Sequence, residues 1–202
     1  MPSYKLFYFP ARGGTEPIRF VLAQAGVPYE DIRLPREKWL QEYKEDSPYG
    51  TMPFLEEDGE RISGSFVILR YLGEKYGLAG STPAENAKIA SLADCLQDMK
   101  MDIVAFLREQ DEAKKAALRK ELKETKLPNR LKYINKQAEQ FTDFFFGKLT
   151  WVDFCFYMAT EFVLPGIPTA LDDFPKLQAI MTKISELPNI KKWIAERPKT
   201  EF

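Results

Sequence analysis

The chain contains no histidine among its 202 residues, so any chemistry must come from other side chains. This excludes Ser-His-Asp and Cys-His nucleophiles and histidine zinc sites, and it leaves tyrosine, lysine and the carboxylates. Tyr8 is the first candidate, because it lies near the end of a strand-like run, Tyr4–Phe9, before the flexible turn Arg12-Gly13-Gly14-Thr15. Ligands bind at the carboxyl ends of parallel-type strands, and a tyrosine hydroxyl placed there can donate a hydrogen bond to a thiolate. The alternative is a tyrosine that only packs within its strand.

Two further segments have the residue types to bind a peptide-like ligand. Met52-Pro53 opens a strand-like run, and a cis-proline at this place in a thioredoxin-type domain presents the backbone of Met52 to a peptide, like an added strand. Ser63-Gly64-Ser65 precedes a periodic apolar run, which predicts a helix N-terminus with a serine cap. Its free N–H groups and the Ser65 hydroxyl would suit a carboxylate, although an ordinary cap that binds nothing has the same pattern.

Other polar patterns have simpler interpretations. Thr150-Trp151-Val152-Asp153 is a capping box with Asp in place of Glu, which is a folding signal. Cys95 and Cys155 lie in helix-like stretches, as free and buried thiols of a reducing compartment do. One face of a long helical stretch is polar, either as a solvated stripe or, in a cleft, as a site for an amino group or a metal ion. That face carries Asp94, Gln97, Asp98, Met101 and Asp102.

The elements that must position these residues change type along the first 80 positions. The order is βαβ and then ββα, which predicts an α/β domain of thioredoxin type with a mixed sheet of about four strands. Asp58-Gly59 is the expected hairpin turn, and Gly26 and Gly77 end two helices. The predicted strands are Tyr4–Phe9, Tyr29–Leu34, Met52–Glu56 and Arg61–Ile62, and the helical segments are Thr15–Ala25, Glu37–Lys44 and Ser65–Tyr76.

From Ala84 onward the pattern predicts helices only. The first, Glu85–Glu109, has a narrow apolar seam with spacings of three and four residues, formed by Ile89, Leu92, Leu96, Met99, Ile103 and Phe106. The others are expected at Asp111–Glu124, Asn129–Gln140, Thr150–Phe162, Phe174–Leu187 and Ile190–Glu196. With Gly80-Ser81-Thr82-Pro83 as linker, the predicted domains are an α/β domain at 1–79, a linker at 80–83 and an all-α domain at 84–202.

The overall charge does not favour polyanionic partners. Twenty-nine basic and 30 acidic residues give a net charge of −1, so nucleic acid and anionic membranes are not expected as partners. The N-terminus lacks the apolar core of a secretory signal, and no stretch reaches the length of a membrane span. The expected location is therefore the cytoplasm.

Taken together, six segments in order resemble the soluble glutathione transferases, and the sigma class in particular. The resemblance spans the whole chain at matching spacing. The segments are YKLFYFPARGGTEPIRF, EKW with a following lysine, SPYGTMPFLEEDG, SFVILRYLGEKYGLAG, GKLTWVDF and IKKWIAERPKTEF.

The resemblance implies that glutathione is the co-substrate and that Tyr8 is catalytic, donating a hydrogen bond to the glutathione sulfur so that the thiolate forms near neutral pH. The thiolate would attack a small hydrophobic electrophile held between the domains. The implied glutathione-binding residues are Tyr8, Trp39, Lys44, Gly50, Thr51, Met52, Gly64 and Ser65, with Gln97 and Asp98 of the partner subunit in a homodimer. The implied electrophile site contains Phe9, Lys100, Ala105 and the C-terminal Phe202.

The sequence departs from the family pattern at two glycines. Gly64 stands where the family usually has glutamine, which predicts weaker glutathione binding, and Gly14 stands where some relatives have an arginine. Gln97 replaces one carboxylate of an acidic cluster that binds a divalent ion in relatives that synthesise prostaglandin D, so no metal is expected. The alternatives are a prostaglandin D isomerase that uses glutathione and a non-enzymatic relative of crystallin or carrier type. A glutaredoxin-type oxidoreductase is disfavoured, because no Cys-x-x-Cys follows the first strand.

Overall fold

The computed structural model describes residues 3–200, and the chain divides into two compact units. The first unit contains the segment up to residue 78 together with the segment from residue 187 onward, and the second contains residues 79–186. No helix in the described part of the chain is both long enough and apolar enough to cross a membrane.

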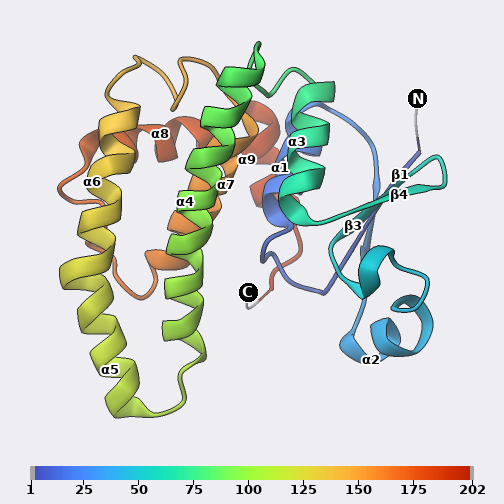
Figure 1. Ribbon diagram of the computed structural model, residues 1–202, viewed down its shortest axis with the longest axis horizontal. Helices are drawn as coiled ribbons and strands as arrows, with labels where there is room; N and C mark the ends of the chain where they lie inside the picture. The colour runs from blue at the N-terminus through green and yellow to red at the C-terminus, as the bar shows by residue number, and fades with distance from the viewer. Residues whose placement is uncertain (1–2, 201–202) are drawn as a thin grey trace. The chain divides into compact units, whose positions relative to one another are not determined.

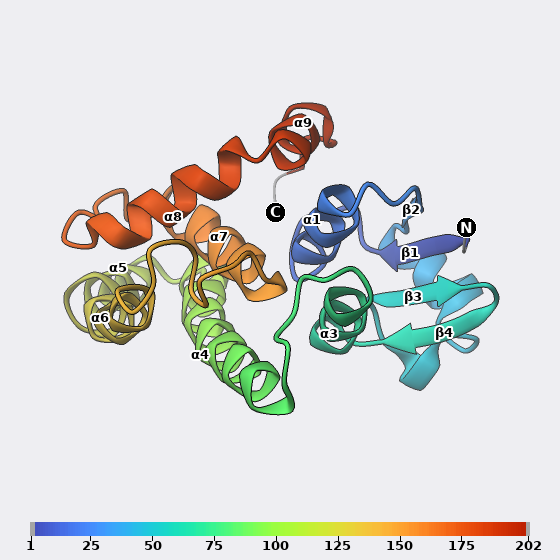
Figure 2. The same cartoon turned by 90° about the horizontal axis from the view of Figure 1, so that it is seen from above.

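A four-stranded mixed sheet forms the centre of the first unit, with strand order β2-β1-β3-β4 (Figure 2). The strands are β1 (Tyr4–Tyr8), β2 (Glu30–Arg33), β3 (Phe54–Glu57) and β4 (Glu60–Ser63). β1 pairs in parallel with β2, whereas β3 is antiparallel to both β1 and β4. The turn at Asp58-Gly59 joins β3 to β4, as the sequence predicts.

Helices α1 (Glu16–Gln24) and α3 (Ser65–Lys75) lie next to each other on one side of this sheet (Figure 2). Their apolar stripes are fully buried with the inner face of the sheet; Ile18, Phe20, Leu69 and Leu72 are at most 1% exposed. The segment after β2 forms a short helix α2 (Arg36–Lys38) that continues into a π-helical turn, Trp39–Tyr43. Helix α9 (Pro188–Glu196) belongs to the same unit and packs on α1.

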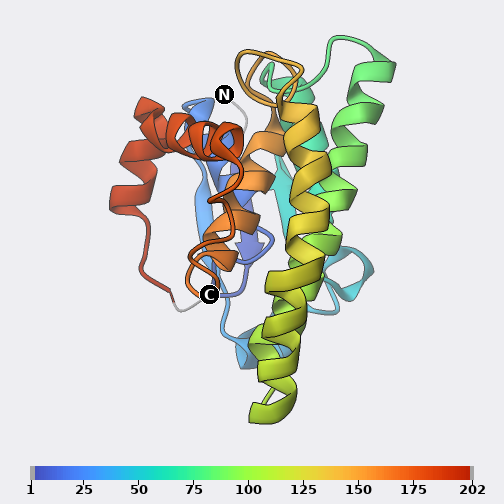
Figure 3. The same ribbon diagram turned by 90° about the vertical axis from the view of Figure 1, so that its left-hand side faces the viewer.

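The second unit is entirely helical in its described residues. Helix α4 (Pro83–Arg108) runs beside α5 (Glu112–Glu121) and α6 (Leu127–Ala138), which a π-helical turn at Leu122–Lys126 joins into one column (Figures 1 and 3). Helix α7 (Trp151–Val163) is the central helix, because eleven of its thirteen residues are buried, and α8 (Pro175–Glu186) packs against it. The α7 N-terminus is fixed by Asp153, whose carboxylate accepts hydrogen bonds from the backbone N–H and the hydroxyl of Thr150, both at 2.8 Å.

The fold class expected from the sequence is confirmed. Residues 187–200 pack with the first unit, and the helical domain predicted at 84–202 includes them. The reason is specific contact: Asn189 donates to the Gln24 carbonyl at 3.1 Å, and Trp193 reaches Glu16 of α1 at 2.9 Å. The expected linker is also ordered, because the Asn86 side chain accepts from the Gly80 N–H at 2.8 Å.

Candidate functional site

The strand register brings three of the candidate residues to the sheet edge at which β1 and β4 end and β3 begins. Tyr8 ends β1, and the antiparallel pairing of Phe7 with Phe54 puts the start of β3 beside that end. The pairing of Phe54 with Ser63 then puts the end of β4, and the following Gly64, at the same edge. Tyr8, Met52 and Gly64 therefore come together from three separate segments of the sequence. A ligand at this edge would meet all three.

The hydroxyl of Tyr8 lies against the loop that follows β1. The backbone carbonyl of Tyr8 accepts a 2.7 Å hydrogen bond from the N–H of Leu34, which fixes the end of the strand. The Phe9 ring meets the Tyr8 ring edge-on, with centroids 5.6 Å apart. A Cβ atom added to Gly13 would be only 2.8 Å from the Tyr8 hydroxyl oxygen, and Gly13 has a φ of +49°. Within residues 3–200 no hydrogen bond joins that hydroxyl to another protein group, so it can donate outward.

The Met52-Pro53 peptide bond is cis, as expected for this segment. Within the described residues, the backbone N–H and C=O of Met52 make no hydrogen bond to the chain. Beside it, the Thr51 and Ser63 hydroxyls are 3.0 Å apart, which joins the start of β3 to the end of β4. The backbone of Met52 therefore has the free donor and acceptor that an added extended peptide requires.

The N-terminus of α3 corrects the expectation of a serine cap. Gly64 occupies the N-cap position, with φ 97° and ψ 126°, and no side chain caps the helix. Such a φ favours glycine, which explains why the cap is a residue without a side chain. Ser65 is the first helical residue, half-buried, and the first N–H groups of the helix have no partner within it.

Trp39 and Lys44 differ in their surroundings. Trp39 is 6% exposed and packs in an apolar cluster with Phe7, Leu34 and Phe54. Lys44 is exposed and follows the π-helical turn, where its N–H donates to the Trp39 carbonyl at 2.9 Å. Its Cε lies 3.9 Å from where a Cβ on Gly50 would be, so Lys44 and the segment before Met52 are neighbours.

The remaining candidate residues lie on α4 of the second unit. Gln97 is half-buried, and the Asp98 side chain is 70% exposed and 3.5 Å from Arg130. Lys100 is half-buried, and its burial lowers the pKa of its ammonium group. Ala105 is exposed. Phe202, the last residue of the expected electrophile site, lies outside the described residues.

Reasoning from the sequence missed three structural features that bear on function. They are the contact of Gly13 with Tyr8, the 93% exposure of Tyr49 in a left-handed conformation, and the full burial of the charged pair Glu16 and Arg19. The adjacent glycines after Tyr8 were a signal for a close approach. A charged pair inside the apolar run of α1 was a signal for buried polar contacts.

The chain is similar to known proteins along its whole length. The sequence pattern described as "Glutathione S-transferase, N-terminal domain" matches residues 7–83, and "Glutathione S-transferase, C-terminal domain" matches residues 97–197. Glutathione S-transferase 1 of Ascaris suum is 39% identical over the full length of both chains. Hematopoietic prostaglandin D synthase of Gallus gallus is 37% identical over 99% of each chain.

Solved structures agree as well. A glutathione S-transferase from Ascaris lumbricoides is 37% identical, with a TM-score of 0.86 and full coverage of both chains. A prostaglandin synthase D of Nilaparvata lugens is 38% identical, with a TM-score of 0.88 over 98% of this chain and all of the other.

Proposed function

The chain belongs to the glutathione S-transferase family, and from this premise we propose which of its residues bind glutathione and activate the thiol. The enzyme uses glutathione as co-substrate, and the thiolate attacks small hydrophobic electrophiles. The new sulfur–carbon bond forms with an electron pair of the sulfur. The bond from that carbon to the leaving group breaks, and the leaving group departs with the bonding pair. The thiol proton goes to solvent.

Tyr8 is the proposed catalytic residue. Its hydroxyl donates a hydrogen bond to the glutathione sulfur, which stabilises the thiolate relative to the thiol. The single observation that carries this assignment is its position: Tyr8 ends β1 at the sheet edge that Met52 and Gly64 share, and its hydroxyl lies beside Gly13 with no hydrogen-bond partner among residues 3–200. The neighbouring Phe9 ring is proposed to face the electrophile.

The glutathione backbone is proposed to pair with Met52. The free N–H and C=O of this residue suit an extended peptide, and Gly50 and Thr51 approach from the same segment. At the γ-glutamyl end, the carboxylate is proposed to bind the N-terminus of α3 at Gly64 and Ser65, where unpaired N–H groups and the helix dipole favour an anion.

The two ends of the tripeptide are proposed to have further partners. The glycine carboxylate lies near Lys44 and the edge of Trp39, and the γ-glutamyl amine lies near Gln97 and Asp98 of the partner subunit. The exposure of the Asp98 carboxylate supports a role toward a second chain, since it is 70% exposed. For the electrophile we retain Phe9, Lys100, Ala105 and Phe202 as proposed contacts, and we propose no metal.

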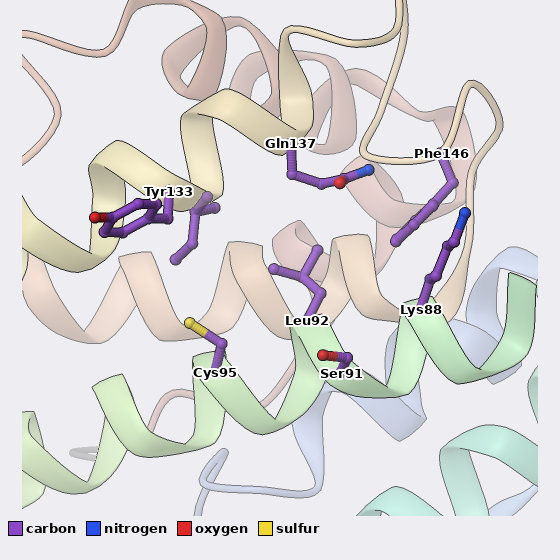
Figure 4. A pocket seen from close by; sticks show the side chains of 8 residues that line it. Lys88, Ser91, Leu92, Cys95, Tyr133, Gln137 and Phe146 are labelled. Atoms are coloured by element: carbon purple, nitrogen blue, oxygen red, sulfur yellow. The ribbon is translucent and has the colours of Figure 1, made fainter.

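A homodimer is part of the proposal, and Tyr49 and a pocket on the second unit are the proposed contact. Tyr49 is 93% exposed and has a φ of 57°, in the left-handed region. Between α4 and α6 lies a pocket of about 260 Å³ (Figure 4). It is lined by Lys88, Ser91, Leu92, Cys95, Tyr133, Ile134, Gln137 and Phe146. That volume is below the usual range of ligand pockets, so it suits one side chain better than a ligand. A two-fold dimer would use each contact twice.

Tyr49→Ala tests this dimer. We expect the dimer dissociation constant to rise about 30-fold, because a buried aromatic anchor contributes about 2 kcal/mol or more at an interface. Tyr49→Phe keeps the ring and is expected to keep the dimer. Sedimentation velocity over a concentration series measures both, and a monomeric wild type or an unchanged Tyr49→Ala dimer would disprove the contact.

A cytoplasmic, sigma-class enzyme of detoxification is the proposed setting. The free thiols of Cys95 and Cys155 support a reducing compartment. Prostaglandin D formation is the second candidate activity, because relatives with that name are 34% and 37% identical to this chain. A non-enzymatic crystallin-like role is disfavoured, because the relatives that cover the full chain carry enzyme names.

The decisive experiment compares conjugation of glutathione to a chlorodinitrobenzene-type acceptor by the wild type and Tyr8→Phe. We expect a loss of about tenfold or more in turnover, which corresponds to about 1.4 kcal/mol of transition-state stabilisation. Tyr71→Phe is the control, since it also removes one tyrosine hydroxyl from the first unit, where that hydroxyl donates to Glu57 at the opposite end of the sheet from Tyr8. Equal rates for wild type and Tyr8→Phe would reject Tyr8 as the thiol activator, and a prostaglandin assay on the same proteins tests the second activity.

A further inference from the structure

Glu16 and Arg19 of α1 form an ion pair whose two side chains are both 0% exposed. Arg19 Nη1 donates to Glu16 Oε2 at 2.9 Å, one helical turn away. A buried ion pair is unfavourable unless its remaining hydrogen-bonding groups also find partners. The partners of this pair lie in three other segments of the first unit, which are the loop after β1, strand β2 and the C-terminal segment.

Arg19 reaches three acceptors in three directions. Besides Glu16, its Nη1 donates to the Ala11 carbonyl at 3.0 Å and its Nε donates to Asp31 Oδ1 at 3.1 Å. The planar guanidinium can serve three acceptors from one rigid group, which an ammonium on a flexible stem cannot do in the same geometry. The Ala11 contact is the informative one, because Ala11 lies in the loop between Tyr8 and α1.

That loop determines where the Tyr8 hydroxyl can lie. Two hydrogen bonds hold the backbone of Ala11. Its N–H donates to the Phe9 carbonyl at 2.7 Å, and its carbonyl accepts from Arg19 Nη1 at 3.0 Å. Two residues later, Gly13 packs against the Tyr8 ring so closely that an added Cβ would be 2.8 Å from the hydroxyl oxygen. Fixing the Ala11 carbonyl therefore fixes the surface against which Tyr8 rests.

The other oxygen of Glu16 is held from the C-terminal segment. Trp193 Nε1 donates to Glu16 Oε1 at 2.9 Å, and Arg197 Nη1 donates to the same oxygen at 3.1 Å. Helix α9 packs on α1 in the same unit (Figure 1). Glu16 therefore links the C-terminal segment to the guanidinium that anchors the loop.

We propose that Arg19 is a positioning residue for thiol activation, and that Glu16 couples it to the C-terminal segment through Trp193 and Arg197. Arg19 fixes the Ala11 carbonyl, the loop then fixes the Tyr8 hydroxyl, and the hydrogen bond from that hydroxyl to the glutathione sulfur keeps its length and direction. The inference rests on the proposed role of Tyr8. In addition to that role, contacts between α1 and the C-terminal segment set the geometry of the site.

Arg19→Lys tests the proposal, because it keeps the charge and removes the three-way contact. We expect turnover to fall about tenfold, as small displacements of catalytic groups do. The pKa of the glutathione thiol in the complex, read from thiolate absorbance against pH, is expected to rise. The KM for glutathione is expected to change by less than about twofold, since Met52 and Ser65 bind the peptide elsewhere at the sheet edge.

A cycle with Tyr8→Phe separates positioning from a general structural role. If Arg19 acts through Tyr8, Arg19→Lys costs about tenfold in the wild type but less than about twofold in Tyr8→Phe. Arg33→Met is the matched control, because Arg33 Nε contacts Asp31 of the same cluster at 2.8 Å but does not reach the loop. It is expected to change turnover and the bound-thiol pKa by little, even if it lowers thermal stability.

Each outcome decides a separate point. An equal loss from Arg19→Lys in both backgrounds, or an unchanged pKa of the bound thiol, would overturn the positioning role. If the single variant Tyr8→Phe turns over as fast as the wild type, the proposed function of Tyr8 is rejected instead. If Arg19→Lys does not fold, Trp193→Phe replaces it: this variant removes one donor to Glu16 and keeps an aromatic ring, and it is expected to raise the bound-thiol pKa in the wild type but not in Tyr8→Phe.

Discussion

Replacing Gly64 by glutamine should separate the stability of this enzyme from its affinity for glutathione. Gly64 has a φ of 97°, which a side chain rarely adopts, so Gly64→Gln is expected to lower the free energy of unfolding by about 1–3 kcal/mol. Space is not the limit, since the nearest side-chain atom to an added Cβ is 3.6 Å away, on Val67. The strain is present with and without glutathione, so it cancels in the binding equilibrium.

The change in the free energy of glutathione binding therefore comes from the contact that the family's usual glutamine makes. One neutral hydrogen bond to the γ-glutamyl group contributes about 0.5–1.5 kcal/mol, which corresponds to a dissociation constant about two- to tenfold lower. We therefore expect Gly64→Gln to be less stable and to bind glutathione more tightly. Isothermal titration calorimetry measures the affinity, and urea unfolding at one protein concentration measures the stability.

Gly59→Gln is the matched control for this prediction. Gly59 has a φ of 92° in the β3–β4 turn, and nothing lies within 4 Å of an added Cβ. Its substitution should lower stability by a similar amount and leave glutathione affinity unchanged. The reasoning is refuted if Gly64→Gln binds glutathione no more tightly than the wild type, or if Gly59→Gln changes the affinity equally.

Two further predictions concern Gly13 and Asp153. Gly13→Ala places a methyl group 2.8 Å from the Tyr8 hydroxyl, so turnover should fall about tenfold, whereas Gly26→Ala, at a φ of 66° with nothing within 4 Å, should cost stability only; steady-state rates and urea unfolding of both variants check this. Burial raises the pKa of the Asp153 carboxyl to about 6, above its value of about 3.9 in an unfolded chain. The stability that this group contributes is therefore full below about pH 4 and is lost as the pH rises through 6, by about 3 kcal/mol, so the advantage of wild type over Asp153→Asn should shrink across that interval. Parallel pH profiles of unfolding for the two proteins would contradict this.

The elements and their order could be predicted from the sequence because each has a local signal. The seam on α4, the capping box before α7 and the Asp58-Gly59 turn depend on residues within a few positions of one another. The sheet edge that joins Tyr8, Met52 and Gly64 is less local. It was expected through the family resemblance, and the register of β1, β3 and β4 is the physical cause.

Contacts between distant segments could not be predicted in the same way. The approach of Gly13 to Tyr8 depends on how the loop after β1 closes, and two adjacent glycines indicate only that a close approach is permitted. The serine cap expected before α3 failed for a similar reason. The residue at the N-cap is decided by the backbone turn between β4 and α3, and that turn needs a φ of 97° at Gly64.

The placement of α9 shows what would have been needed to predict the division of the chain. An amphipathic helix at 188–196 must bury an apolar stripe, but the stripe itself does not say against which unit. The polar groups are more selective, because a fully buried carboxylate needs donors for both of its oxygens. Glu16 takes one donor from Arg19 and two from the C-terminal segment, through Trp193 and Arg197. A buried charged pair in an apolar helix is therefore a prediction of long-range partners, and here those partners determine which unit the C-terminal helix joins.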